Sequence, residues 1–595
     1  MSGDADVGAG GVDMAGNMGA MNVGHDSHAA VKRRGPAAIR APGSLLTPPA
    51  FAGASNRHPN VPISASRPTQ IPAPGKSPRQ ARLRWLAALC TVSLSCGLPP
   101  AAAQNNLPAL GDTESEDFGL GPERKLGEQI MREIRRDPDY LDDPVLLEYL
   151  ESLWNPLVAQ ARRNGNINAD LDQRFAWEVF LVRDRSINAF ALPGGYVGMH
   201  LGLIALTAGR DELASVLAHE LSHVTQRHIA RSIANSQRQS LIGAAAMILG
   251  VLAAARSNSV DAANALIVGG QAAAIQGQLN FSRDMEREAD RIGFTLLSGA
   301  GFSPGGMAAM FEKLDQSSRL NDNGAFPYLR SHPLTSDRIG EARSRLGAVA
   351  PSALGPALEH NIAQARARVL MDNRVDSLRR WQAMDAERPG STPAERMAAA
   401  YSSALASTLL RDWMRADMAL HNALGLAGGE PRAARAVALL TAQSLLERGD
   451  PTRAAVALKP FLSEPTRPVM LLASQVALAG AAGGAGNAVA LKQSADQLQT
   501  WLALHPNDAS AWAHLGQAWA GLDQPLRAMR AEAEVRLALG DLNGAVDRLR
   551  AGQRSARSGR NVDFVEASVI DSRLRAIEGQ RRRNAADERN GSERQ

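Results

Sequence analysis

Residues 213–232, LASVLAHELSHVTQRHIARS, place three ionisable side chains on one turn of an apolar, helix-like run. His219 and His223 are four residues apart, and Glu220 lies between them. Side chains four apart on a helix lie almost above one another, so the two imidazoles project from the same side. We predict a helix over residues 211–235, because apolar residues spaced by four, four and three give it one buried face: Leu213, Leu217, Leu221 and Val224.

Zinc ligation is one chemistry that this spacing permits. Catalytic zinc sites use three protein ligands, commonly imidazole and carboxylate, and leave a position for water. His219 and His223 can supply two ligands from one rigid helix. Glu220 can face the water and accept its proton as the water attacks a carbonyl. A polar edge on a solvated helix has the same spacing, so the motif alone leaves both interpretations open.

A second helix-like stretch, FSRDMEREADRIGFTLL at residues 281–297, offers the missing carboxylates. Glu286 can act as the third ligand, and Asp290, one turn later, can hold the distal N–H of a ligating imidazole. A salt-bridged solvent face is the alternative for this stretch. The helix also has a buried side, formed by Ala289, Ile292, Leu296 and Leu297.

The composition of the chain is that of a large globular protein. Its 595 residues suggest several domains, and 45% of them are hydrophobic while 21% are charged. The net charge of +5 is unevenly distributed, because residues 1–84 carry ten Lys or Arg and four Asp or Glu. The remainder is close to neutral, so charge gives no argument for a nucleic-acid partner.

The N-terminal region divides into an extension and a targeting segment. Residues 1–80 are rich in Gly, Ala, Pro and Ser without periodicity, which indicates a start codon assigned too early or a disordered arm. Residues 81–103 have the basic flank, short apolar run and small-residue end of a signal peptide, with cleavage predicted after Ala103. Lipidation at Cys96 and retention as a membrane anchor are the alternatives. Cys90 and Cys96 are the only cysteines, so cleavage would leave none.

The surroundings of the motif predict a mainly α fold with a small β component. Helical spacing covers residues 117–163, and aromatic and β-branched residues predict a strand over 175–184. A strand, tight turn, strand and helix start are predicted over 187–206, with the turn at Pro-Gly-Gly, residues 193–195. The Ala- and Gly-rich residues 241–278 suit either a helical hairpin that is buried or covers the site, or a membrane contact.

Ala/Leu-rich amphipathic helices dominate residues 355–575. An α-solenoid is predicted, with a plain helical bundle as the alternative. Ala545 follows the last of the recurring alanines by 17 residues, which indicates incomplete or rearranged final repeats. The polar residues 576–595 are expected to be a disordered tail. The alanines that recur at intervals of 33 to 41 residues are Ala416, Ala454, Ala495 and Ala528. The residues at tetratricopeptide-repeat offsets are Trp512, Leu515, Gly516, Trp519 and Ala528.

His-Glu-x-x-His followed by Glu-x-x-x-Asp, here H-E-L-S-H and E-R-E-A-D-R-I-G, resembles a known family of zinc metalloproteases. The family includes HtpX and the mitochondrial and prenyl-processing membrane proteases. The chain is most similar to the periplasmic BepA-type, or β-barrel assembly-enhancing, proteases over residues 117–575. Three features carry this similarity: the signal peptide, the segment NAFALPGGYVGMHLGLI before the site, and the repeats after it. The resemblance implies a zincin-like domain over residues 117–350 and a tetratricopeptide-like α-solenoid over 355–575.

The resemblance also assigns roles within the expected site. It implies one zinc ion per subunit, with Glu220 as general base and Asp290 as the residue that orients a ligand. The implied zinc ligands are His219, His223 and Glu286.

A further histidine is assigned by the segment RSHPLTSDRI, residues 330–339. His332 is similar in position to a histidine that can occupy the open zinc position in BepA-type proteins, which gives a latent enzyme. A loop histidine without a role is the alternative. His228 lies five residues after His223, off the ligand face, and His200 lies near a strand end, so both are expected to be structural.

The expected function is zinc-dependent endopeptidase activity in the periplasm of a Gram-negative bacterium, with or without chaperone-like activity. The implied substrates are misfolded or stalled outer-membrane β-barrel proteins. The β-barrel assembly machinery and peripheral contact with the outer membrane are further expected partners, and no nucleic acid is expected. An extended substrate could add to a strand edge within residues 188–200, near Gly194, Gly195 and Tyr196. The alternative is a non-proteolytic chaperone or scaffold that docks on the assembly machinery through its repeats.

Overall fold

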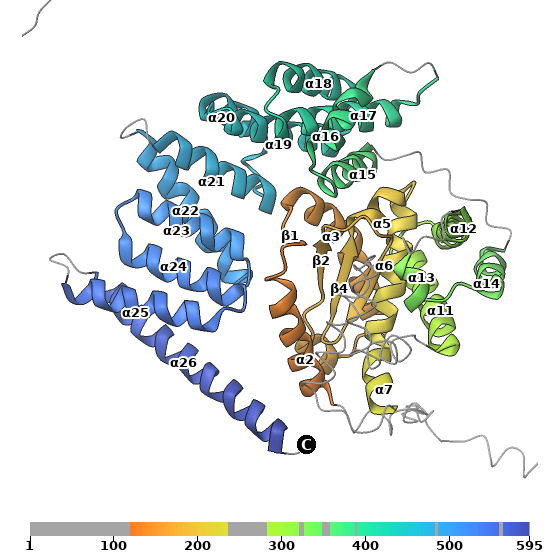
Figure 1. Ribbon diagram of the computed structural model, residues 1–595, viewed down its shortest axis with the longest axis horizontal. Coiled ribbons are helices and arrows are strands. Elements are labelled where there is room, and N and C mark those ends of the chain that lie inside the picture. The colour runs from red at the N-terminus through yellow and green to blue at the C-terminus, as the bar shows by residue number, and fades with distance from the viewer. Residues whose placement is uncertain are drawn as a thin grey trace, which may run out of the picture. The chain divides into compact units, whose positions relative to one another are not determined.

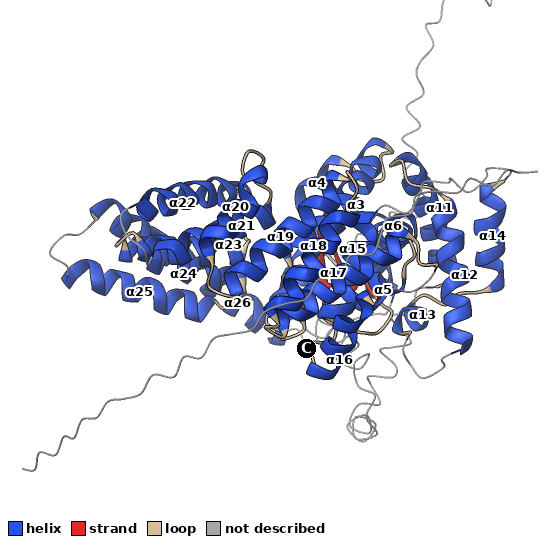
Figure 2. Cartoon of the chain, turned by 90° about the horizontal axis from the view of Figure 1, so that it is seen from above, coloured by secondary structure: helices blue, strands red, loops and turns tan. Residues whose placement is uncertain are grey.

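The computed structural model combines one small sheet with many helices (Figures 1 and 2). The predicted fold class, mainly α with a small β component, is confirmed. The predicted extension, signal peptide and hairpin at residues 1–80, 81–103 and 241–278 lie outside the described residues. The structure describes residues 119–235, 282–320, 326–347, 358–386, 390–481, 486–558 and 563–593.

The first helices begin at local capping residues. Asp143 accepts a hydrogen bond from the Leu146 backbone N–H at 2.9 Å, and Pro144 occupies the first helical position. Asn168 caps the next short helix through the N–H of Leu171. These helices are α2 (Leu120–Ile134), α3 (Pro144–Arg163) and α4 (Ala169–Arg174).

Within the described residues, the sheet has four strands in the order β1-β2-β4-β3. β2 and β4 are parallel, whereas β1 pairs with β2 and β3 pairs with β4 in antiparallel fashion. Gly194 and Gly195 form the predicted tight turn between β3 and β4 with φ angles of 79° and 91°, a conformation that favours glycine. The strands are β1 (Tyr140–Leu141), β2 (Glu178–Val182), β3 (Ala189–Leu192) and β4 (Tyr196–His200).

The helix predicted over residues 211–235 is interrupted, so that part of the prediction is wrong. α5 (Leu201–Leu206) leads into α6 (Arg210–Thr225), which ends before Arg227. Arg227 has a φ angle of 52°, which breaks the helical path, and it forms an ion pair with Glu123 at 2.8 Å. The chain then starts a separate helix, α7 (His228–Asn235), at an angle that returns His228 to α6.

α6 is the central helix of the N-terminal part, and all its residues from Leu213 to Thr225 are buried. α11 (Arg283–Gly299) packs closely on α6, since a Cβ at Gly293 would lie 3.2 Å from the backbone of Ala218. A close approach of this kind brings side chains from both helices to one point. The helices that follow are α12 (Gly305–Leu320), α13 (Pro327–Ser331) and α14 (Ser336–Leu346).

The C-terminal part is a succession of helices, mostly antiparallel pairs (Figure 1). Its core consists mainly of alanine and leucine side chains at helix–helix contacts. The helices are α15 (Leu358–Leu370), α16 (Val375–Gln382), η2 (Ala383–Asp385), α17 (Pro393–Leu409), α18 (Trp413–Leu426), α19 (Pro431–Glu447), α20 (Pro451–Leu458), η3 (Lys459–Phe461), α21 (Arg467–Ala481), α22 (Gly486–Leu504), α23 (Ala509–Gly521), α24 (Pro525–Ala538), α25 (Leu542–Ser558) and α26 (Phe564–Glu593).

The recurring alanines mark one helix of each pair. Those predicted from their spacing are buried and lie on α18, α20, α22 and α24. Ala545 is also buried but lies on α25, the first helix of the last pair, which explains its short interval. The assignment of these pairs as tetratricopeptide repeats stays a prediction.

The polar tail predicted from residue 576 is helical instead. α26 continues to Glu593, with Ile577 buried and Glu578 paired with Arg550 of α25 at 2.8 Å. Its first half packs on α25, and the helix continues past the exposed residues 581–583 with the same backbone hydrogen bonding. The prediction of disorder is therefore wrong for residues 576–593.

α15 belongs to both parts of the molecule. Ala363 and Ala367 pack in the core of the N-terminal part, while Ile362 and Ala365 pack in the core of the helical C-terminal part. The side-chain amide of Gln364 donates to the Thr207 carbonyl at 2.6 Å, between α5 and α6. The proposed division of the chain near residues 350–355 thus lies immediately before a shared helix. Among the described residues, no helix has the length and apolar character needed to span a membrane.

Candidate metal centre

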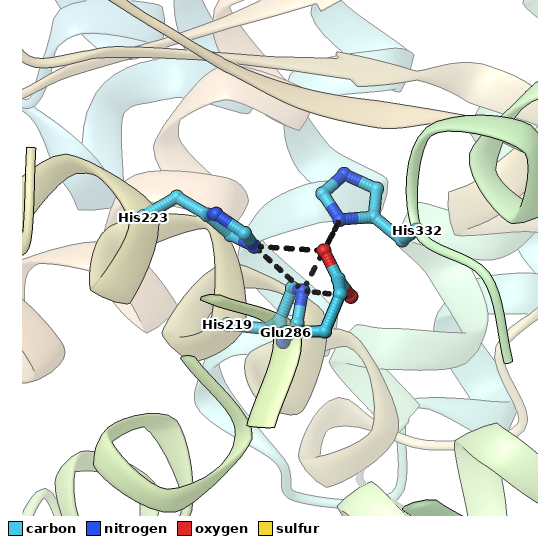
Figure 3. A group of neighbouring side chains, drawn as sticks. All are labelled: His219, His223, Glu286 and His332. Carbon is cyan, nitrogen blue, oxygen red and sulfur yellow. Dashed lines mark hydrogen bonds and ion pairs between the residues drawn. The ribbon is translucent and has the colours of Figure 1, made fainter. Parts of the chain in front are cut away.

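The two histidines of α6 face each other across one helical turn. The Nε2 atoms of His219 and His223 are 3.0 Å apart, and both side chains are buried. Figure 3 shows the rings projecting from α6 toward a carboxylate on α11. The predicted pairing of these imidazoles on one helix face is therefore present in the structure.

Two more side chains reach the same point from other elements (Figure 3). Glu286 lies in the first turn of α11, and its Oε1 and Oε2 atoms are each 3.5 Å from the Nε2 of one α6 histidine. His332 directly follows α13, and its Nδ1 is 3.0 Å from Glu286 Oε1 and 3.3 Å from His219 Nε2. One nitrogen or oxygen atom from each of the four residues lies within 4.8 Å of the others.

These separations fit a single tetrahedral metal ion. Zinc-to-ligand distances of about 2.0–2.1 Å place neighbouring ligand atoms roughly 3.3 Å apart. Five contacts among these side chains, made with both oxygens of Glu286, measure 3.0 to 3.5 Å, and one donor atom from each residue can be chosen so that all four lie within 4.8 Å. The donor set of imidazole and carboxylate is also one that zinc prefers. The residues present therefore fit a metal ion.

The contact between His219 and Asp290 points to the same conclusion. Asp290 Oδ1 lies 3.0 Å from His219 Nδ1, and this adjacent carboxylate favours the ring proton of a neutral imidazole on that atom. The Nε2 lone pair of His219 then faces His223 and Glu286. A lone pair directed at other electron-rich atoms is stabilised by a cation placed between them.

Glu220 lies beside this cluster on α6 and is completely buried. His332 Nε2 is 3.5 Å from its Oε1, and neither carboxylate oxygen has a hydrogen-bond partner among the described residues. A buried carboxylate without hydrogen bonds is costly for folding. Its position therefore suits a carboxylate that receives a proton during a reaction.

Electrostatics in the metal-free site place a proton on His219. Burial by itself lowers the pKa of His219, but hydrogen bonds to Asp290 and Glu286 outweigh burial and raise it to about 10. Burial and the charge on His219 hold the pKa of His223 well below its usual value. For Glu286, the charge of His332 and the bond to His219 outweigh burial, so the pKa of the carboxyl is well below its usual value. A proton and a metal ion therefore compete for the same buried anions.

Arg338, on α14, is a component that the sequence did not single out. Its guanidinium contacts Glu286 Oε2 at 2.7 Å and both oxygens of Asp290 at 2.7 and 2.8 Å. It also donates to the Pro333 carbonyl, next to His332, at 2.9 Å. These contacts balance two buried carboxylates and fix the segment that carries His332. In sequence, Arg338 has no feature that distinguishes it from the other arginines on polar helix faces.

Tyr328 of α13 also went unnoticed in the sequence. It is buried with its ring 4.7 Å from that of His332 and 6.5 Å from that of His219. Its backbone N–H donates to the Ile187 carbonyl at 3.2 Å, just before β3. Tyr328 therefore packs the His332 segment against both the metal centre and the sheet.

Within residues 188–200, where a substrate-binding strand edge was predicted, the edge lies at β3 and not at the residues singled out, Gly194, Gly195 and Tyr196. The two glycines form the turn, and Tyr196 begins β4, which is paired with β2 on one side and β3 on the other. The prediction missed that β2 joins the sheet beside β4, which places β4 inside the sheet. The edge strand next to α6 is β3.

Comparison with known proteins agrees with this geometry. Residues 152–346, which contain the cluster, match peptidase family M48. The mitochondrial metalloendopeptidase OMA1 of Schizosaccharomyces pombe is 36% identical over 269 residues, which are 44% of this chain and 72% of that protein. The chain belongs to peptidase family M48.

Two other M48 relatives carry names that specify a process. The putative β-barrel assembly-enhancing protease of Vibrio cholerae is 39% identical over 288 residues, 48% of this chain and 56% of that protein. The β-barrel assembly-enhancing protease of Escherichia coli K12 is 32% identical over 293 residues, 48% of this chain and 57% of that protein. The match thus spans a little over half the length of these relatives. Membership of M48 and the buried His/Glu cluster together indicate a metal cofactor.

Proposed function

We propose that this M48 protein is a zinc-dependent endopeptidase of the Gram-negative periplasm. The observation that carries the proposal is the convergence of His219, His223 and Glu286 beside the buried Glu220. A bound zinc ion would polarise a peptide carbonyl and make a water molecule more acidic. Zinc is the metal of choice here because it accepts imidazole and carboxylate in tetrahedral geometry.

The reaction assigned to the protein residues is proton transfer during peptide hydrolysis. Glu220 accepts a proton from the attacking water and delivers it to the nitrogen of the leaving amine. Asp290 holds His219 through its Nδ1–H, and Arg338 holds Asp290 and Glu286 in place. A purely scaffolding function would not account for a buried carboxylate at the position of Glu220.

His332 closes the site in the arrangement described. With a zinc ion bound, three imidazoles and one carboxylate would complete a tetrahedral set and would leave no position for water or substrate. We therefore infer a latent form, which becomes active when His332 withdraws. Arg338, through its bond to the Pro333 carbonyl, and Tyr328, through its bond to Ile187, hold the closed segment.

The edge of β3 is the proposed substrate platform. An extended chain can add to an edge strand through main-chain hydrogen bonds, which gives low sequence specificity. The backbone bond of Tyr328 to Ile187 lies immediately before this edge. The His332 segment would thus leave the strand edge and the metal centre together.

Unfolded or misassembled outer-membrane β-barrel proteins are the proposed substrates, because the similar bacterial proteases are named for β-barrel assembly. The repeats supply exposed apolar side chains that can contact unfolded clients. Among the described residues, every large hydrophobic residue counted as exposed lies at or after Val375. Contact with the β-barrel assembly machinery and with the outer-membrane surface belongs to the same proposal.

Cleavage of an unfolded β-barrel protein by the purified chain, with and without a chelator, tests the proposal. In the opened His332→Ala protein, we expect the additional change Glu220→Gln to lower cleavage by about 10²- to 10⁴-fold, while zinc content and thermal stability stay close to those of His332→Ala. His332→Ala should raise cleavage, because it opens the fourth position. Undiminished cleavage when Glu220→Gln is added to His332→Ala, or cleavage that survives removal of the metal, would disprove the proposed mechanism.

A further inference from the structure

A second carboxylate reaches the metal centre through a histidine that the sequence suggested to be structural. His228 Nδ1 lies 2.9 Å from His223 Nδ1, on the side of the ring away from the cluster. On the other side of the His228 ring, Nε2 lies 3.1 Å from Glu288 Oε2. His223 and His228 are completely buried. Glu288, His228 and His223 therefore form a continuous chain that ends at a proposed ligand.

The directions of these hydrogen bonds determine the tautomer of His223. A carboxylate only accepts, so His228 donates from Nε2 to Glu288. Neutral His228 then has its lone pair on Nδ1, where it accepts a hydrogen bond from the Nδ1–H of His223. The lone pair of His223 is thereby placed on Nε2, the atom that faces His219 and Glu286.

The fold builds this chain with two specific features. The positive φ of Arg227 ends α6 and turns the first residue of α7 back toward it. Arg231, one turn into α7, contacts Glu288 at 3.1 Å and holds the carboxylate in reach of His228. The rings of His223 and His228 meet edge to face, with centroids 4.8 Å apart. This geometry directs one ring nitrogen of His228 at His223 and the other at Glu288.

We propose that His228 and Glu288 are positioning residues that hold His223 in the tautomer required for metal binding. The inference rests on the proposed role of His223 as a ligand. The two α6 histidines then differ in how they are held: Asp290 contacts His219 directly, whereas Glu288 acts on His223 through an intervening imidazole. Groups that hold a ligand in this way typically contribute 10- to 100-fold to metal affinity.

Substitutions of His228 separate hydrogen bonding from packing. In His228→Asn, the side-chain carbonyl can replace Nδ1 as the acceptor, so Zn²⁺ affinity should stay within about threefold of native. In His228→Phe the acceptor is lost, and the affinity should fall about 10- to 100-fold. Glu288→Gln keeps an acceptor for His228, whereas Glu288→Ala does not. Zn²⁺ affinity should therefore be lower in Glu288→Ala than in Glu288→Gln. Competition with a chromogenic chelator measures the Zn²⁺ dissociation constant of each full-length variant.

His200→Asn is the matched control, because His200, at the end of β4, is also buried but bonds to Ser186 in the loop between β2 and β3, away from His223. It should leave the Zn²⁺ dissociation constant unchanged. If His228→Phe does not fold, His228→Gln replaces it, since its longer amide does not place an acceptor at the Nδ1 position. Equal Zn²⁺ affinities for the Asn variant and for the Phe or Gln variant would overturn the proposal.

Nitrogen-15 NMR of histidine-labelled, zinc-free protein reads the tautomer directly. The proposal predicts the proton of His223 on Nδ1 in the native protein and in His228→Asn. In His228→Phe, a substantial fraction of the His223 rings should carry the proton on Nε2 instead. A native His223 protonated on Nε2 would overturn the proposal even if the protein cleaves substrates. A protein that binds Zn²⁺ with the predicted tautomer but cleaves nothing would refute only the proposed protease activity.

Discussion

The peptidase part and the repeat part of this chain bury different kinds of side chain. Between α6, α11 and α14, the peptidase part encloses imidazoles, carboxylates and a guanidinium around one point. The helical C-terminal part encloses mainly alanine and leucine, with exposed ion pairs such as Arg536–Asp541 and a few buried ones such as Arg467–Asp508. The first region depends on charges that compensate one another, and the second depends on close packing.

This difference in buried side chains distinguishes residues that serve function from residues that serve stability. Burying charges is costly, and a buried ion pair often contributes less to stability than apolar side chains of equal volume. The cluster around His219 therefore has a chemical use that outweighs this cost. Ala495 and Leu515, by contrast, contribute through contact area alone. Substitutions in the two regions should accordingly differ in how they change the free energy of unfolding and the Zn²⁺ affinity.

Arg338→Ala should give the largest loss of stability, because it leaves the carboxylates of Glu286 and Asp290 buried without their guanidinium. Breaking a buried pair in this way typically costs about 3–5 kcal/mol. Urea unfolding of the metal-free protein measures the loss. Arg343→Ala is the control, since its ion pair with Glu312 is largely exposed and should contribute about 0–1 kcal/mol. Equal losses from both variants would contradict the account of the peptidase core.

Leu515→Ala should destabilise the repeats without altering the metal centre. Leu515 is buried between α22, α23 and α24, and deletion of a buried leucine side chain typically costs about 2–5 kcal/mol. Its effect on Zn²⁺ affinity should be negligible. Leu504→Ala, at a position that is 79% exposed, should change the free energy of unfolding by less than about 0.5 kcal/mol. A large fall in Zn²⁺ affinity caused by Leu515→Ala would show that the two regions are not separable in this way.

Zn²⁺ affinity should increase with pH, because the metal displaces the proton of His219. The pKa of that imidazole is raised to about 10 in the metal-free site, whereas the pKa of His223 is lowered. One proton released per ion gives about a tenfold tighter dissociation constant per pH unit, or roughly a hundredfold between pH 6 and 8. Titration calorimetry in buffers of different ionisation enthalpy measures the proton count. A pH-independent affinity in this window would contradict the proton-bound site.

The raised pKa of His219 also predicts how the stability of the metal-free protein depends on pH. A raised pKa in the folded state contributes stability that is fully present below the unfolded value of about 6.5. That contribution is lost as the pH rises toward 10, through the folded-state pKa of His219. Bound Zn²⁺ should remove this dependence, because the imidazole is then already deprotonated.

Much of the site could be predicted because its parts repeat with helical spacing. His219 and His223 lie on one face of α6, and Glu286 and Asp290 lie one turn apart on α11, as their separations indicate. His332 could be found only through the resemblance to a family, since nothing around it in the sequence specifies that its ring enters the cluster. Arg338 could not be found, because its role depends on where α14 packs.

The errors in the fold also have local physical causes. The break at Arg227 was missed because a positive φ is uncommon for an arginine and leaves no mark in the apolar pattern. Tyr196 was placed at an edge because the β3–β4 hairpin is local, whereas the pairing of β4 with β2 is not. The chain Glu288–His228–His223 was missed because it requires that turn at Arg227.

Zinc X-ray absorption spectroscopy on the purified protein tests the central claim most directly, because it counts the imidazoles bound to the metal. The account predicts three imidazoles and one carboxylate oxygen in the native protein, from His219, His223, His332 and Glu286. In His332→Ala the count should fall to two imidazoles, with the fourth position open. Two imidazoles in the native protein, or a count unchanged by His332→Ala, would contradict a metal centre closed by His332.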